Sequence, residues 1–275
     1  MCIRDSSFGA VSIVMPNLLT KLGAEVLVVN PFASTASATG DVHPDRFAHV
    51  AELVRASGSD LGFVIDPDGE SGVAVDDSGH VLTPEELMLA IVQLAAEVVP
   101  DAQVAVPVNV TAAVERLMAH GTVVRTKVWG TDLMEAANDK GTVFAGTADG
   151  GCIWPDFLPA YDAATTLVKL LDLLGAVDRP LSAVVAMLPE THVVHDTIVT
   201  PWERKGTVMR ELVERVGSRK VELLDGVKVT DDRGWALVLP DPEEAVTHVW
   251  AEGATNIDSR RLAEEYGQLI RDLAR

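Results

Sequence analysis

Cysteine is scarce in this sequence, which has two in 275 residues. Cys2 and Cys152 lie far apart with no C-x-x-C pair, which excludes a disulfide scaffold and a cysteine-based zinc site. So few thiols are typical of a reducing compartment, and we expect a cytoplasmic protein. Long apolar runs are also missing, because charge, glycine or proline interrupts each hydrophobic segment before it reaches the length of a membrane span. We therefore expect no membrane partner.

Basic side chains are the second shortage. The chain has 22 lysines and arginines against 41 aspartates and glutamates, a net charge of −19. Most of such a surface would repel the phosphates of a nucleic acid, so we expect no nucleic-acid partner. What the chain has in quantity is apolar residues, at 48%, which suffice for the cores of two or three modest domains.

Residues 56–115 contain no lysine or arginine, and they hold the most informative motif of the chain. The apolar run Leu61–Ile65 predicts a buried strand, and Asp66, Asp68 and Glu70 follow at its carboxyl end, where open α/β sheets place ligands. Alternate acidic residues on such a turn can converge on one hard cation, of which Mg²⁺ fits best. A solvated turn is the alternative, since Asp, Pro and Gly are turn formers, and the spacing alone favours neither.

Helical and strand patterns alternate through the first 115 residues, which predicts an α/β fold. Thr83 and Glu86 form a capping box at the start of one helix. The predicted elements are helices at 11–22, 44–57 and 84–98, strands at 25–29, 61–65 and 103–106, and a hairpin turn at 76–79.

The rest of the chain predicts a second helical and strand unit and then a small α+β domain, because its last elements are strands followed by one helix. The elements predicted here are helices at 112–119, 134–139, 163–174, 181–188 and 209–216, a strand at 142–145, strands at 221–224, 227–229, 235–239 and 246–250, and a closing helix at 259–273.

Four motifs, in order, resemble the α-D-phosphohexomutases, the family of phosphomannomutase and phosphoglucomutase. Asp66–Ser71 stands where that family has its metal loop, D-G-D-G-D-R. Arg125–Lys127 resembles the opening of the family's third domain, and Phe144–Gly151 stands at its sugar-recognition loop, F-G-G-E-x-S-G-H. Leu223–Val229 is similar to the start of the phosphate-binding fourth domain. The resemblance implies an α/β fold with two mixed-sheet α/β/α domains followed by a small α+β C-terminal domain.

The same resemblance implies the domain boundaries. Residues 8–113 correspond to the second domain, 114–217 to the third and 218–275 to the fourth, while residues 1–7 match none of them and are expected to be a foreign leader. The family's first domain, with its phosphoserine loop T-A-S-H-N-P, has no counterpart, so we expect an N-terminally truncated product whose partners would be the missing domains of the same protein. Thr35–Ser37 matches three letters of that loop, but no His-Asn-Pro follows, and we interpret it as a chance match.

In the metal loop, the resemblance implies a weak Mg²⁺ site at Asp66, Asp68 and Glu70. Glutamate has a longer reach than the family's third aspartate, but it can still bind a cation. Ser71 replaces the arginine that helps to hold the phosphoserine region, and its hydroxyl cannot replace a guanidinium.

The other two loops depart further from the family pattern. Thr147 and Asp149 stand where the family's glutamate and serine bind sugar hydroxyls, and the histidine of that loop is lost. The phosphate loop R-P-S-G-T-E-P is replaced by Leu239–Ala245, in which Leu239 takes the place of the arginine and Asp241 and Glu243 add negative charge. Such a degenerate phosphate loop would repel a phosphate.

Two functions from different classes follow. The first is a catalytically degenerate phosphohexomutase module of mannose-1-phosphate and GDP-mannose metabolism, structural or regulatory in a larger protein; it resembles the C-terminal part of actinobacterial mannose-1-phosphate guanylyltransferase and phosphomannomutase fusions. The second is a truncated but active mutase that accepts an unusual sugar phosphate. A haloacid-dehalogenase-like phosphatase is a weaker third hypothesis, because a hairpin, not a further parallel strand, is predicted after Asp68.

His192, His195 and Asp196 are the other candidate metal ligands. No third ligand is spaced to join the two histidines, so the sequence predicts loop or surface histidines instead of a metal cluster.

Overall fold

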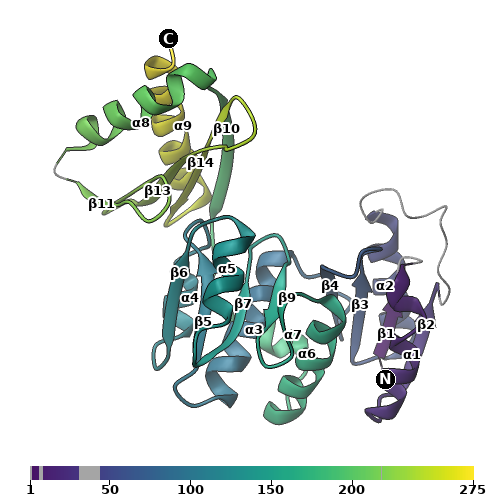
Figure 1. The fold of residues 1–275 in the computed structure, drawn as a ribbon. Coiled ribbons are helices and arrows are strands. Elements are labelled where there is room, and N and C mark those ends of the chain that lie inside the picture. Colours follow the sequence, from purple (N-terminus) through teal and green to yellow (C-terminus); the bar gives the residue numbers. More distant parts are fainter. Residues whose placement is uncertain (1, 6–8, 31–43, 218) are drawn as a thin grey trace. The chain divides into compact units, whose positions relative to one another are not determined.

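The structure is a computed structural model that describes residues 2–5, 9–30, 44–217 and 219–275 (Figure 1). The chain divides into two compact units, the first formed by residues 1–106, 114–125 and 130–188 and the second by residues 107–113, 126–129 and 189–275. The described residues form three sheets. The match at Thr35–Ser37 lies outside the described residues.

The first sheet is mixed and has the strand order β2-β1-β3-β4. β1 pairs in parallel with both β2 and β3, and β4 runs antiparallel to β3. Cys2–Asp5, which the sequence assigns to a foreign leader at residues 1–7, form β1 between two other strands, with Ile3 fully buried; the foreign origin stays a prediction. The elements of this region are β1 (Cys2–Asp5), the short 3-10 helix η1 (Ala10–Ser12), α1 (Met15–Lys21), β2 (Val26–Val29), α2 (Pro44–Ser57), β3 (Leu61–Ile65) and β4 (Gly72–Asp76).

The second sheet is also mixed, with the order β6-β5-β7-β8-β9. Leu133 and Ala137 of α5 pack against Ala145 on one face, and Trp154 on the other face donates a hydrogen bond from Nε1 to Thr166 of α6 at 3.1 Å. Helices therefore cover both faces (Figure 1). The elements are α3 (Pro84–Val98), β5 (Gln103–Pro107), α4 (Ala113–Leu117), β6 (Thr122–Thr126), α5 (Gly130–Ala137), β7 (Thr142–Gly146), β8 (Cys152–Trp154), β9 (Leu158–Tyr161), α6 (Ala163–Val177) and α7 (Leu181–Val185).

The third sheet is antiparallel throughout, in the order β10-β14-β13-β12-β11. Helices α8 and α9 pack on one of its faces, where Val208, Leu212, Tyr266 and Ile270 are buried in one core with apolar residues of the strands. The elements are β10 (Val193–Val199), α8 (Trp202–Val216), β11 (Lys220–Glu222), β12 (Val227–Asp231), β13 (Gly234–Pro240), β14 (Val246–Gly253) and α9 (Asn256–Leu273). The predicted fold class, two mixed-sheet domains followed by a small α+β domain, is confirmed.

Local sequence signals explain where the site-bearing elements begin and end. The capping box at α3 is present, since Glu86 N donates to Thr83 Oγ1 at 3.1 Å and Thr83 N donates to Glu86 Oε2 at 2.7 Å.

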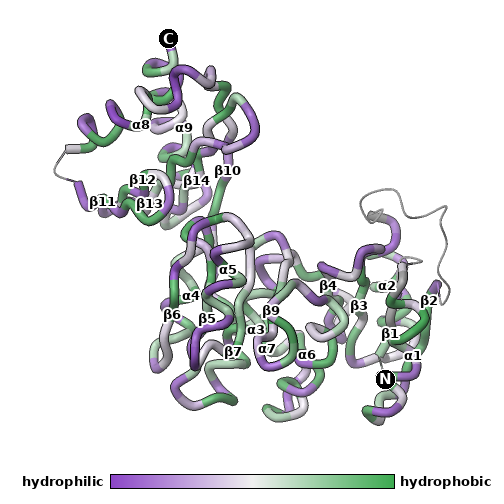
Figure 2. Tube along the Cα trace, viewed as in Figure 1, coloured by the Kyte–Doolittle hydropathy of each residue, from purple (hydrophilic) through white to green (hydrophobic). Residues whose placement is uncertain are grey.

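Figure 2 shows apolar residues running along the strands of the first two sheets, whereas much of α8 is hydrophilic. Within the described part of the chain, we find no helix with the length and apolar character to cross a membrane.

Candidate functional site

The loop after β3 anchors itself through Asp66. Its Oδ1 accepts hydrogen bonds from Gly69 N at 2.6 Å and Glu70 N at 2.9 Å, and its Oδ2 accepts from Ser71 N at 3.0 Å and Ser71 Oγ at 2.7 Å. A carboxylate offers about four lone-pair directions, so these four bonds use all of them. The serine that replaces the family's arginine supplies two of the four donors.

The three acidic side chains of this loop do not converge. Asp68 lines a cavity of about 760 Å³ whose other lining is largely apolar, whereas Asp66 and Glu70 line a separate polar cavity of about 240 Å³. Among the described residues, no group of three or more His, Cys, Asp and Glu side chains is arranged to hold a metal ion. The predicted Mg²⁺ set of Asp66, Asp68 and Glu70 therefore does not fit the ion as the loop is arranged, because Asp66 would first have to release its amide partners.

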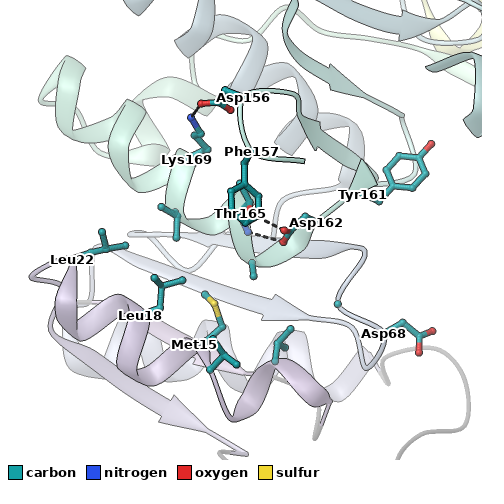
Figure 3. Close-up of a pocket in the computed structure, with 15 residues that line it drawn as sticks. Met15, Leu18, Leu22, Asp68, Asp156, Phe157, Tyr161, Asp162, Thr165 and Lys169 are labelled. Carbon is teal, nitrogen blue, oxygen red and sulfur yellow. Dashed lines mark hydrogen bonds and ion pairs between the residues drawn. The ribbon is translucent and has the colours of Figure 1, made fainter. Parts of the chain in front are cut away.

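The larger cavity lies between α1 and the start of α6 (Figure 3). Two of its acidic side chains are already paired: Asp162 caps α6 by accepting from Thr165 N and Thr165 Oγ1, both at 2.8 Å, and Asp156 forms an ion pair with Lys169. The apolar lining comes mainly from one face of α1 with Phe157 opposite, and the residues involved are Val11, Val14, Met15, Leu18, Leu22, Phe157, Ala164 and Val168.

The sugar-loop residues Thr147 and Asp149 bond to each other. Thr147 Oγ1 donates to Asp149 Oδ1, and it also accepts from Gly151 N at 3.1 Å. The family's histidine has no room at Gly151, because a Cβ added there would lie 2.7 Å from the Tyr161 ring. Thr147 Oγ1 and Asp149 Oδ1 therefore hold the loop together.

A β-bridge between Ser71 and Gly151 brings the metal loop and the sugar loop together. Asp149 consequently lines the smaller polar cavity with Asp66 and Glu70, and Tyr161 closes one side. Burial is the main cause that raises the pKa of Tyr161. The negative charges of Asp149 and Glu70 raise this pKa further, and Asp149 has the larger effect of the two. Sequence patterns could not find this role of Tyr161, because the residue belongs to β9, which was not predicted.

At the phosphate-loop position, between β13 and β14, Asp241 accepts hydrogen bonds from backbone amides of its own loop. Asp241 Oδ1 accepts from Glu243 N at 2.7 Å and from Glu244 N at 2.6 Å, and Oδ2 lies 2.9 Å from His248 Nε2. The His248 hydrogen bond, followed by the Glu243 amide, lowers the pKa of Asp241 to about 2. Glu243 itself is exposed and contributes its amide, not its carboxylate.

Lys205 is the nearest buried cation to this loop, and it too is committed. Its side chain is 8% exposed, and its ammonium donates to the backbone oxygens of Asp241, at 2.6 Å, and Glu244. It also lies 3.6 Å from the centroid of the Trp202 ring. The lysine therefore fastens the loop to α8 and is not available to an anion.

Two histidines, His195 and His248, form a pair that the sequence did not predict. His195 Nε2 lies 3.0 Å from His248 Nδ1, and the His195 ring stacks on Trp250 with centroids 4.5 Å apart. His192 is elsewhere, with Nε2 3.5 Å from a Glu190 oxygen, and the β10 register places Asp196 opposite buried Val249. The structure does not bring His192, His195 and Asp196 together; the partner of His195 is His248, 53 residues away in sequence.

Comparison with known proteins gives this site its family context. The family model for phosphoglucomutase/phosphomannomutase, alpha/beta/alpha domain III, matches residues 83–192. A probable phosphoglucosamine mutase from Methanopyrus kandleri is 30% identical over 276 residues, covering 98% of this chain and 61% of that protein. The chain is therefore similar to α-D-phosphohexomutases in sequence along most of its length. A phosphoglucomutase/phosphomannomutase from Thermococcus kodakarensis is 26% identical and is covered to 59%. The chain thus spans about three fifths of the length of the curated relatives it matches.

Solved phosphohexomutases share the fold. A phosphoglucomutase/phosphomannomutase family protein from Burkholderia thailandensis superposes with a TM-score of 0.82 at 18% identity, over 99% of this chain and 60% of that one. An Aspergillus fumigatus N-acetylphosphoglucosamine mutase, solved with GlcNAc-6P and magnesium, has a TM-score of 0.63 at 13% identity, over 100% of this chain and 62% of that one.

The sequence predicts a third domain at 114–217, and the family match covers residues 83–192. In the structure, β5 lies inside the second sheet and β10 inside the third. The domain bounds stay a prediction. Helix α8, predicted as part of the third domain, packs against α9.

Proposed function

We propose that this chain is a phosphohexomutase module without phosphoryl-transfer activity of its own, with a structural or regulatory role in a larger protein of mannose-1-phosphate and GDP-mannose metabolism. The observation that carries the proposal is the carboxylate of Asp241, which occupies the two amides of its own loop. In the family these amides, with an arginine and a serine, hold the phosphate that is not being transferred.

Phosphate binding at this loop would require the displacement of a tethered anion. Asp241 is joined to the loop by a few covalent bonds, so it competes with a free phosphate at a high effective concentration. Its low pKa keeps it ionised at neutral pH, when an incoming phosphate is also negative. Leu239 in place of the family's arginine offers no compensating cation, and Lys205 is held by backbone oxygens.

The metal loop supports the same proposal. Asp66 has all its acceptor directions filled by Gly69, Glu70 and Ser71, so a divalent ion could bind only at the expense of these bonds. Mg²⁺ binding at Asp66, Asp68 and Glu70 stays a prediction, and we expect it to be weak. Calorimetry with Mg²⁺ tests this prediction. Equal heats for the chain and for an Asp66→Asn/Asp68→Asn variant would refute Mg²⁺ binding at these residues.

The central experiment measures sugar-phosphate binding and turnover together. We expect no binding of inorganic phosphate or mannose 6-phosphate at millimolar concentration, and no mutase turnover with a bisphosphate activator. The variant Leu239→Arg/Asp241→Ser should gain phosphate binding, because it frees the loop amides and supplies a cation. Turnover by the unsubstituted chain above that of a Glu70→Ala control would refute the proposal, and so would phosphate binding that the double substitution does not strengthen.

A second candidate is an active mutase that accepts an altered sugar phosphate and depends on further chain for its phosphoserine. The polar cavity that joins the metal loop to the sugar loop favours it, because Asp66, Glu70 and Asp149 line one space. Turnover by a longer form of the protein, lost on Asp149→Ala, would decide for this candidate.

A further inference from the structure

The C-terminal sheet holds an ordered line of three side chains. Asp241 lies at the end of β13, His248 on β14 and His195 on the edge strand β10. Asp241 Oδ2 is 2.9 Å from His248 Nε2, and His248 Nδ1 is 3.0 Å from His195 Nε2. The register puts His195 opposite Trp250 and His248 opposite Thr197, so the two histidines are diagonal neighbours on one face of the sheet.

The carboxylate fixes which nitrogen of His248 carries the proton. A carboxylate oxygen can only accept, so His248 Nε2 donates to Asp241 Oδ2. In the neutral ring, His248 Nδ1 then presents a lone pair toward His195. This arrangement, an imidazole that donates to a carboxylate with one nitrogen and offers the other, is the one that histidine metal ligands adopt in proteins.

The two facing nitrogens share a hydrogen bond in this structure, and their spacing is close to the one that a shared metal ion would require. Two imidazole nitrogens bound to one tetrahedral zinc ion at about 2.0–2.1 Å each lie roughly 3.3–3.4 Å apart. The observed 3.0 Å requires a small opening of the pair, accompanied by rotation of the rings toward a common point. His195 is exposed on an edge strand and can make this adjustment while its ring stays against Trp250.

We propose that His195 Nε2 and His248 Nδ1 form a two-histidine site for a transition-metal ion such as Zn²⁺ or Ni²⁺, with Asp241 positioning His248 and water completing the coordination. Imidazole prefers these ions to Mg²⁺, so the proposed site differs in kind from the metal loop. A bound ion would join the edge strand β10 to β14.

Competing thiol ligands are not accessible. Cys152 is fully buried, and burial raises the pKa of its thiol to about 12; Cys2 is also buried. The proposal does not rest on the proposed function, although both involve Asp241: its Oδ1 accepts the loop amides, and its Oδ2 accepts from His248.

Calorimetric titrations with Zn²⁺ and with Ni²⁺ test the site. We expect one equivalent to bind to the unsubstituted chain, and His195→Ala or His248→Ala to weaken binding at least about tenfold. Asp241→Asn, which keeps the shape but removes the charge that orients His248, should weaken it about 10–100-fold. His49→Ala is the matched control, because His49 is an exposed histidine on α2, and it should leave the affinity unchanged.

A second measurement remains decisive if a substitution disturbs folding. Long-range ¹H–¹⁵N spectra of the histidine rings should show His248 protonated at Nε2, and Zn²⁺ should shift His195 Nε2 and His248 Nδ1 first among all the ring nitrogens. The proposal is overturned if no saturable binding is found, if His195→Ala binds as well as the unsubstituted chain, or if Zn²⁺ shifts other histidines first.

Discussion

Replacing Asp66 by alanine should destabilise the first unit by about 2–3 kcal/mol. The substitution removes the acceptor of three backbone amides and one hydroxyl. At about 0.5–1.5 kcal/mol for each hydrogen bond, the four would total roughly 2–6 kcal/mol, and we take the lower part of that range because water can reach the half-buried loop. Ser71→Ala removes a single hydroxyl donor and should cost about 1 kcal/mol or less.

Urea unfolding gives the stability change, and amide hydrogen exchange at Gly69, Glu70 and Ser71 reports on the loop directly. In Asp66→Ala these three amides should exchange faster, while the amides of β3, Leu61–Ile65, keep their protection. Glu70→Ala is the control, since its exposed side chain accepts no loop amide and its backbone N–H remains. Unchanged exchange at all three amides in Asp66→Ala would refute the self-anchored loop and would leave the Asp66 carboxylate open to a cation.

Three further results are expected. Asp241 has a folded-state pKa of about 2, below its usual 3.8, so it contributes stability above about pH 4 that is lost as the pH falls through 2; Asp241→Asn should remove this part of the acid dependence, measured by thermal melts from pH 5 to about 2. Lys205→Met should cost roughly 2–3 kcal/mol in urea unfolding, because two loop carbonyls lose their shared buried donor, whereas Lys220→Met on the exposed start of β11 should cost almost nothing. The Cys152 thiol, with its pKa raised to about 12 by burial, should resist iodoacetamide at pH 8 in the native protein and react after denaturation; native labelling at the denatured rate would contradict its burial.

Elements with a complete local signal could be predicted closely from the sequence. The strand Leu61–Ile65 and the helix Pro84–Val98 have the expected bounds. The strand is an uninterrupted apolar run before an acidic turn, and the helix has a capping box, an initial proline and a buried face. Each of these signals lies within a few residues of the feature it determines, so no tertiary information was needed.

The strands that the sequence missed are those whose character depends on distant partners. Cys2–Asp5 has too few residues for a pattern, and it is recognisable as a strand only because β2 and β3 flank it. Val193–Val199 is an edge strand with polar and exposed positions, His195, Asp196 and Thr197, so it lacks the alternation of a half-buried strand. Because β10 was missed, so was the register that brings His195 to His248.

In the metal loop and in the phosphate loop, the first aspartate accepts hydrogen bonds from amides of its own loop. This shared arrangement explains why the sequence alone could not decide the function of either loop. In each, the first aspartate turns its carboxylate back onto amides two to five residues later: Asp66 onto Gly69, Glu70 and Ser71, and Asp241 onto Glu243 and Glu244. An aspartate at such a position can accept hydrogen bonds from its own loop, or it can bind a ligand. The residue type is the same in both cases, so the sequence does not distinguish them. Restoring one family residue is therefore insufficient. Leu239→Arg alone should form an ion pair with the tethered Asp241 carboxylate and bind no phosphate, while Leu239→Arg with Asp241→Ser should bind it. Phosphate binding by the single variant would show that Asp241 yields its amides readily, and the case for a self-filled loop would fail.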